Sequence, residues 1–81
     1  MIRTKNQAFA NHTGMALNEL QDYRYHYGRT STAVWWIDDS YYCVTKGNEN
    51  PAVHRDGMEF DWVQMTDNFA AADGFQIWIS N

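Results

Sequence analysis

The sequence predicts an α+β fold in which an N-terminal helix packs on one face of a four- to five-stranded antiparallel sheet. Helical spacing of apolar residues is confined to the first third of the chain, and strand-like alternation follows it. No long helical segment separates the predicted strands, which favours antiparallel over parallel pairing. With 81 residues, we expect one domain that spans 1–81.

The helical prediction covers residues 4–28. Thr13 is the candidate N-cap, and Gly28 stands where a C-terminal glycine belongs. Spacings of three and four join the apolar residues Ala16, Leu17, Leu20, Tyr23 and Tyr27. Gly14 weakens continuity with an earlier turn around Phe9. We expect the helix to pack on the sheet through Leu17, Leu20 and Tyr27.

A first hairpin is predicted after the helix. Its strands are at about 32–37 and 41–45, and both are rich in aromatic and β-branched residues. The sequence Asp38-Asp39-Ser40 between them is typical of a turn.

The rest of the chain predicts a second hairpin, a short helix and a last strand. The second hairpin joins 52–55 to 58–62 through Asp56-Gly57, a strong two-residue turn signal. The short helix is predicted at 67–72, and the last strand at 75–80.

The adjacent Trp35 and Trp36 show that both faces of the sheet receive a large ring. Neighbouring side chains on a strand point to opposite faces. The one predicted helix of useful length covers a single face. We therefore expect one tryptophan to lie in the core under the helix and the other at a dimer or partner surface, and the sequence does not say which.

The net charge of −4 is distributed unevenly. Residues 1–37 carry four basic and two acidic residues, whereas residues 38–81 carry two basic and eight acidic ones. Acidic surfaces disfavour phosphate backbones and favour basic partners. The simpler interpretation is that these charges keep an aromatic sheet soluble.

No motif for catalysis, metal binding or a cofactor is recognisable. Cys43 lies in the middle of a predicted strand, where an inert thiol is the commoner case. The three histidines show no zinc-ligand spacing, and no glycine-rich phosphate loop is present. The stretch from Arg24 to Arg29 alternates basic and aromatic residues, a pattern found in nucleic-acid binding and also at solvated helix ends. Overall acidity argues against direct nucleic-acid binding.

These observations predict a small acidic protein-binding module without a catalytic role. In size, charge and lack of motifs the chain resembles phage-encoded inhibitors, including anti-CRISPR proteins and DNA mimics. The resemblance implies an inhibitor that occupies a basic, nucleic-acid-binding surface on a larger partner, since carboxylates can replace phosphates there. The candidate partner-binding residues are Trp35, Trp36, Asp38, Asp39, Tyr41, Tyr42, Glu59 and Asp61.

Two alternatives stay open. One is a homodimeric structural or assembly protein that pairs through an uncovered aromatic face. The other is a small enzyme that uses His54 with Asp56, or Cys43. We expect a cytoplasmic protein, in the host cytoplasm if it is phage-encoded, because no secretion signal or membrane-spanning run is recognisable.

Overall fold

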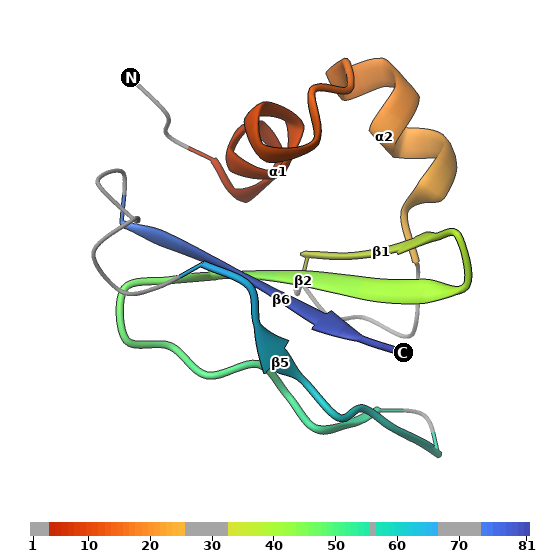
Figure 1. Cartoon of the computed structure of the whole chain (residues 1–81), viewed down its shortest axis with the longest axis vertical. Coiled ribbons are helices and arrows are strands. Elements are labelled where there is room, and N and C mark those ends of the chain that lie inside the picture. The colour runs from red at the N-terminus through yellow and green to blue at the C-terminus, as the bar shows by residue number, and fades with distance from the viewer. Residues whose placement is uncertain (1–3, 26–32, 56, 67–73) are drawn as a thin grey trace.

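The chain folds around a four-stranded antiparallel sheet, which confirms the predicted α+β class. The computed structural model describes residues 4–25, 33–55, 57–66 and 74–81. The strands are β1 (Ala33–Ile37), β2 (Ser40–Lys46), β5 (Val63–Gln64) and β6 (Phe75–Ser80). They lie side by side in the order β1-β2-β6-β5. Helices lie on one side of this sheet, and the segment that connects β2 to β5 runs along the other side (Figure 1).

The N-terminal segment forms two helices where the sequence predicted one main helix. They are α1 (Lys5–Thr13) and α2 (Leu17–Tyr23). The N-cap prediction at Thr13 is wrong, because Thr13 is the last residue of α1 and the N-cap position of α2 is Ala16. The first helix is capped by Thr4, whose hydroxyl accepts a hydrogen bond from the Gln7 N–H at 3.0 Å. Gly14 ends α1 in the left-handed region (φ 78°), which a glycine enters without a Cβ clash.

The second helix is shorter than predicted. It ends at Tyr23, and its N-cap residue Ala16 makes no side-chain hydrogen bond. The predicted packing through Leu17 is also wrong, because this side chain is 45% exposed while Leu20 is buried. Tyr27 and Gly28 lie outside the described residues.

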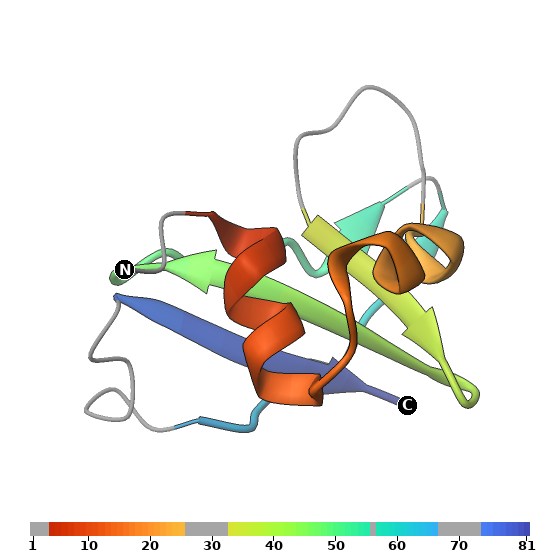
Figure 2. The ribbon, with the colours of Figure 1, turned by 90° about the horizontal axis from the view of Figure 1, so that it is seen from above.

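The helices and the sheet enclose the main core. Phe9 of α1 stacks on Trp35 of β1, with ring centroids 4.3 Å apart and an interplanar angle of 25°. Trp35 is 1% exposed and Phe9 is fully buried, so this stack lies at the centre of the core. The other buried members of the cluster are Ala8, Ala10, Leu20, Ala33, Val44, Phe75 and Ile77. Figure 2 shows α1 crossing above β2 and β6, with α2 beside it.

The opposite face is covered by the chain itself, through a hairpin that does not join the main sheet. Strands β3 (His54–Arg55) and β4 (Met58–Glu59) form a separate two-stranded sheet around Gly57. The predicted strand over 58–62 therefore ends early, although its alternation holds: Phe60 is buried and Glu59 is exposed. The Phe60 N–H still donates to the Val53 carbonyl at 2.8 Å, and the chain then leaves the hairpin.

Buried polar side chains on this second face are hydrogen-bonded. The indole N–H of Trp78 donates to the Thr45 hydroxyl at 2.9 Å. The amide of Gln76 donates to the Gly47 carbonyl at 3.0 Å. The Ser80 hydroxyl accepts from the Asp61 N–H at 2.9 Å, which ties the crossing segment to β6. Each bond offsets the cost of burying a polar group. The short helix predicted at 67–72 lies outside the described residues.

The turn of the first hairpin lies where the sequence predicts it, except that Ser40 belongs to β2 and not to the turn. Asp38 and Asp39 have φ of 51° and 65°, and Ile37 pairs directly with Ser40. Two successive residues with positive φ are typical of a type I′ turn, whose twist matches that of the strands. Aspartate tolerates this region better than most residues, but glycine tolerates it best.

The two adjacent tryptophans should differ sharply in their effect on stability. We expect Trp35→Ala to lower the free energy of unfolding by about 3–5 kcal/mol, because it removes a buried ring from the core. Trp36 is 40% exposed, so Trp36→Ala should lower it by about 1 kcal/mol, the range of one aromatic edge contact. Urea unfolding followed by circular dichroism measures both. Equal losses would contradict the assignment of the two faces.

The turn gives a second stability prediction. Asp39→Gly should raise the free energy of unfolding by about 0.5–1 kcal/mol, because glycine removes the cost of positive φ. Asp39→Ala should lower it, since alanine tolerates the left-handed region less well than aspartate does. Asp61→Gly is the matched control, because Asp61 is exposed and lacks a positive φ. A gain of the same size in the control would show that loss of charge, not turn geometry, is responsible.

Candidate functional site

A cluster of aromatic rings on the second face of the sheet surrounds Tyr41. Its ring makes edge-on contacts with Trp36, Tyr25 and Phe60, at centroid distances of 4.4, 5.1 and 5.2 Å. These residues come from four segments: β1, β2, the chain after α2 and the chain after β4. Edge-on pairs at these distances are favourable in energy and fix ring orientation. Tyr41 thus joins four segments of the chain in one surface.

The segment after α2 reaches this surface because it pairs with the outer edge of β1. Arg24 forms an antiparallel bridge with Trp35, and the Tyr25 N–H donates to the Val34 carbonyl at 2.8 Å. Because neighbouring side chains of an extended segment point to opposite faces, the side chains of Arg24 and Tyr25 lie on different sides of the sheet. The Arg24 guanidinium lies 5.3 Å from the ring centroid of Trp35 on the helix side, whereas Tyr25 packs on the second face. The Tyr25 hydroxyl donates to the sulfur of Met58 at 2.7 Å.

A hollow of about 410 Å³ opens beside Trp36, and we call it the aromatic groove. Its lining residues are Asp22, Tyr23, Arg24, Tyr25, Trp36 and Tyr41. Tyr23 and Trp36 are 43% and 40% exposed, so two large rings present their surfaces to solvent. Exposed aromatic side chains with restricted rotamers are the residues that most often anchor interfaces.

The charges around the groove favour a cationic ligand. Asp22 lies in the lining, and the exposed Asp38 and Asp39 follow Trp36 by two and three residues. Arg24 also lines the groove, but its guanidinium is on the helix side, where it donates to the side-chain amide oxygen (Oδ1) of Asn6 at 3.3 Å. Aromatic faces together with carboxylates are the combination that attracts an arginine or lysine side chain.

The predicted partner-binding residues separate into three groups. Trp36 and Tyr41 line the groove, and Asp38 and Asp39 form the nearby turn. Trp35 is a core residue, and the half-buried Tyr42 contacts Phe9 on the helix side at 5.6 Å. Both are therefore directed away from the groove. Glu59 and Asp61 are exposed, but they do not line it.

Sequence reasoning missed Asp22, Tyr23 and Tyr25 as site residues. It placed all three on one long helix and noted Tyr25 only within a basic and aromatic stretch. The signal that could have found them is the run Tyr23-Arg24-Tyr25, whose alternation suits an extended edge segment as well as a helix.

The residues of the enzyme alternative are placed as follows. Cys43 is fully buried, with its sulfur 3.9 Å from the Val44 carbonyl oxygen. His54 is exposed on β3, and Asp56 lies outside the described residues. Within the described part of the chain, no three His, Cys, Asp or Glu side chains are grouped so that they could hold a metal ion.

Comparison of the chain with protein-family models, with curated proteins and with solved structures finds no match. Among the described residues, no helix has the length and apolar character needed to cross a bilayer.

The central position of Tyr41 predicts a pH effect on stability. Burial raises the pKa of the Tyr41 phenol above its ordinary value of 10.0, and the nearby Tyr25 adds to the rise. The folded state therefore holds this proton more tightly than the unfolded state. The resulting stability is present below pH 10.0 and is lost as the pH rises through the folded-state pKa.

We expect Tyr41→Phe to lose less stability than the wild type between neutral pH and the alkaline range, because phenylalanine cannot ionise. Urea unfolding at a series of pH values measures this, with Tyr23→Phe as the control for an exposed tyrosine. Identical alkaline losses in wild type and Tyr41→Phe would contradict the prediction.

Proposed function

We propose that this chain is a small protein-binding module whose aromatic groove receives a basic side chain from a larger partner. The observation that carries the proposal is the exposed pair Trp36 and Tyr23 in a hollow that Asp22 also lines. Asp38 and Asp39 follow Trp36 in the turn of the hairpin. A guanidinium or ammonium group would lie against the ring faces and meet carboxylates at the rim.

The aromatic groove is small enough to be one anchor point within a larger protein interface. A stable complex buries about 800 Å² on each partner, which is roughly a seventh of the 5395 Å² surface of this chain. The groove supplies a desolvated centre for such an interface, and the turn residues Asp38 and Asp39 supply part of a polar rim. This arrangement of aromatic centre and polar rim is common in protein interfaces.

Binding of this kind would inhibit the partner. A binder that places carboxylates on a basic surface competes with the phosphates that this surface would otherwise hold. We therefore propose an inhibitor of the phage anti-defence or anti-CRISPR kind, acting in the cytoplasm on a partner that binds nucleic acid. Support for this comes from the acidic rim of the groove and the net charge of −4.

Self-association is a second candidate, and a separate observation favours it. Val63 and Met65 are 60% and 45% exposed at β5, the outer strand of the sheet. An outer strand with exposed apolar side chains can pair with a second copy. This surface is distinct from the aromatic groove, so the two candidates can be separated by mutation.

Titration with an oligo-arginine peptide tests the groove. We expect Trp36→Ala to weaken binding about two- to thirtyfold, which corresponds to the ~0.5–2 kcal/mol of a cation–π contact. The double change Asp38→Asn and Asp39→Asn should also weaken binding, and asparagine tolerates the positive φ of the turn. Intrinsic tryptophan fluorescence measures affinity, and amide NMR shifts locate the peptide.

A charge-matched control decides between the groove and general attraction. None of these four carboxylates lines the groove itself, but Asp38 and Asp39 follow Trp36 by two and three residues. Glu59→Gln with Asp61→Asn removes the same number of charges from a different segment, so it should weaken binding less than the change at Asp38 and Asp39. Equal losses in the two double variants would overturn the groove. Light scattering of the same proteins tests self-association: a dimer that persists in Trp36→Ala and disappears in Val63→Lys would support the second candidate.

A further inference from the structure

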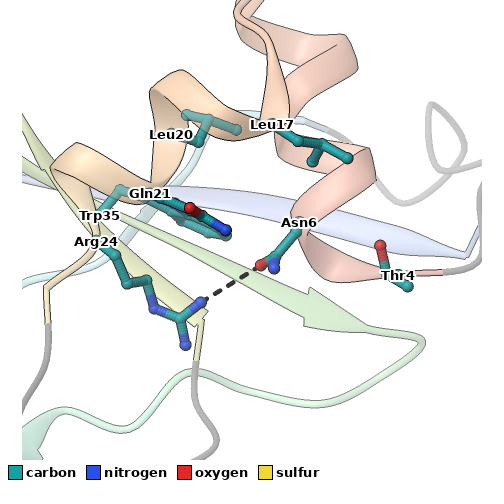
Figure 3. Close-up of a pocket in the computed structure, with 7 residues that line it drawn as sticks. All are labelled: Thr4, Asn6, Leu17, Leu20, Gln21, Arg24 and Trp35. Carbon is teal, nitrogen blue, oxygen red and sulfur yellow. Dashed lines mark hydrogen bonds between the residues drawn. The ribbon is translucent and has the colours of Figure 1, made fainter.

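A second hollow lies on the helix side of β1, separate from the aromatic groove. It has a volume of about 220 Å³ and lies between α1, α2 and the indole of Trp35. Figure 3 shows its lining side chains, which come from both helices and from β1. We call it the interhelical pocket. We propose that the interhelical pocket binds a small carboxylic acid with an apolar body of about one ring.

The charge of the lining selects an anion. Arg24 brings a guanidinium to the pocket, and the described lining includes no acidic side chain. The guanidinium donates to the side-chain amide oxygen (Oδ1) of Asn6 at 3.3 Å, a long bond, as the dashed line in Figure 3 marks. A carboxylate is a stronger acceptor than an amide and can take two parallel N–H bonds from a guanidinium. A carboxylate is therefore a stronger partner for this guanidinium than the Asn6 amide is.

The walls select an apolar body. Leu17, Leu20 and Trp35 supply the apolar surface, and Leu17 is 45% exposed while the other two are buried. A ligand here would cover Leu17, which otherwise meets water. The polar side chains of Asn6 and Gln21 face the same space and can orient a carboxylate. Apolar walls with a few convergent polar groups are typical of small-molecule sites.

The volume limits the size of the ligand. An apolar cavity of about 150 Å³ is enough to hold benzene. At 220 Å³ the interhelical pocket has room for one ring and a carboxylate, and it is smaller than the ~300–1,000 Å³ of sites for drug-sized ligands. A free monocarboxylic acid fits these limits better than a peptide, whose chain would have to pass between the helices.

The position of Trp35 explains why this pocket can be rigid. Its ring is fixed from one side by the Phe9 stack, and the Arg24 guanidinium lies 5.3 Å from its centroid. The backbone bridge between Arg24 and Trp35 fixes both residues relative to each other. A site that is formed before the ligand arrives binds it with a smaller loss of conformational entropy.

Titration with benzoate tests the proposal, with benzamide as a neutral ligand of similar shape. We expect benzoate to bind the full chain about tenfold or more tightly than benzamide, because a charge-assisted bond to Arg24 is lost with the amide. The methyl signals of Leu17 and Leu20 and the indole signal of Trp35 should shift in NMR spectra. Equal affinity for the two ligands, or shifts elsewhere, would overturn the proposal.

Substitution of two basic residues, one inside the pocket and one outside it, completes the test. Arg24→Gln should lose the preference for benzoate and keep the weak binding of benzamide, which also shows that the pocket is still folded. Lys46→Gln removes the same charge from an exposed strand end outside the pocket, and it should keep the preference. If Arg24→Gln unfolds the chain, the comparison of benzoate and benzamide in the wild type decides alone. N-acetylphenylalanine carries the chain of a peptide terminus, and tighter binding of it than of benzoate would overturn the assignment to a free acid.

Discussion

The alternation of side chains along β1 is the constraint on which the rest of the structure depends. Trp35 and Trp36 are adjacent, so the backbone must send one ring to each face of the sheet. Each ring then requires its own cover. Phe9 of α1 covers Trp35 by stacking, and Tyr41 contacts Trp36 edge-on. A sheet with large rings on both faces needs covering segments on both sides. This chain supplies one cover from its N-terminal helices and the other from the segment between β2 and β5.

The second face is therefore not left empty. Phe60 and Trp62 stack on each other at 4.8 Å, and Phe60 contacts Tyr41 from the hairpin side. The hairpin of β3 and β4 thereby becomes a third layer. What it leaves uncovered is the end of the sheet near the β1–β2 turn, where Trp36 and Tyr23 stay exposed. The hairpin layer covers most of the second face but does not extend over Trp36 and Tyr23, and the aromatic groove lies there.

Arg24 connects the two sites that we propose. Its backbone closes the outer edge of β1, which prevents further strand pairing at that bridge. Its side chain lies in the interhelical pocket, and the residue also borders the aromatic groove. The neighbouring Tyr23 and Tyr25 both line the groove. Tyr23 does so from the end of α2, and Tyr25 from the segment that pairs with β1. One short extended stretch thus positions residues for a cationic ligand on one side and an anionic one on the other.

Local patterns in the sequence were sufficient for the fold class, the first hairpin with its Asp38-Asp39 turn, the last strand and the division of the two tryptophans between faces. These features depend on neighbouring residues, through φ preferences and two-residue alternation. The sequence did not show that α2 ends at Tyr23, that Arg24 pairs with Trp35, or that Phe60 covers Tyr41. Each of these depends on contacts between segments far apart in the chain. The aromatic groove consists of such contacts. Trp36 and Tyr41 could be named in advance, the run Tyr23-Arg24-Tyr25 gave an ambiguous signal that suits a helix as well, and Asp22 had no local signal.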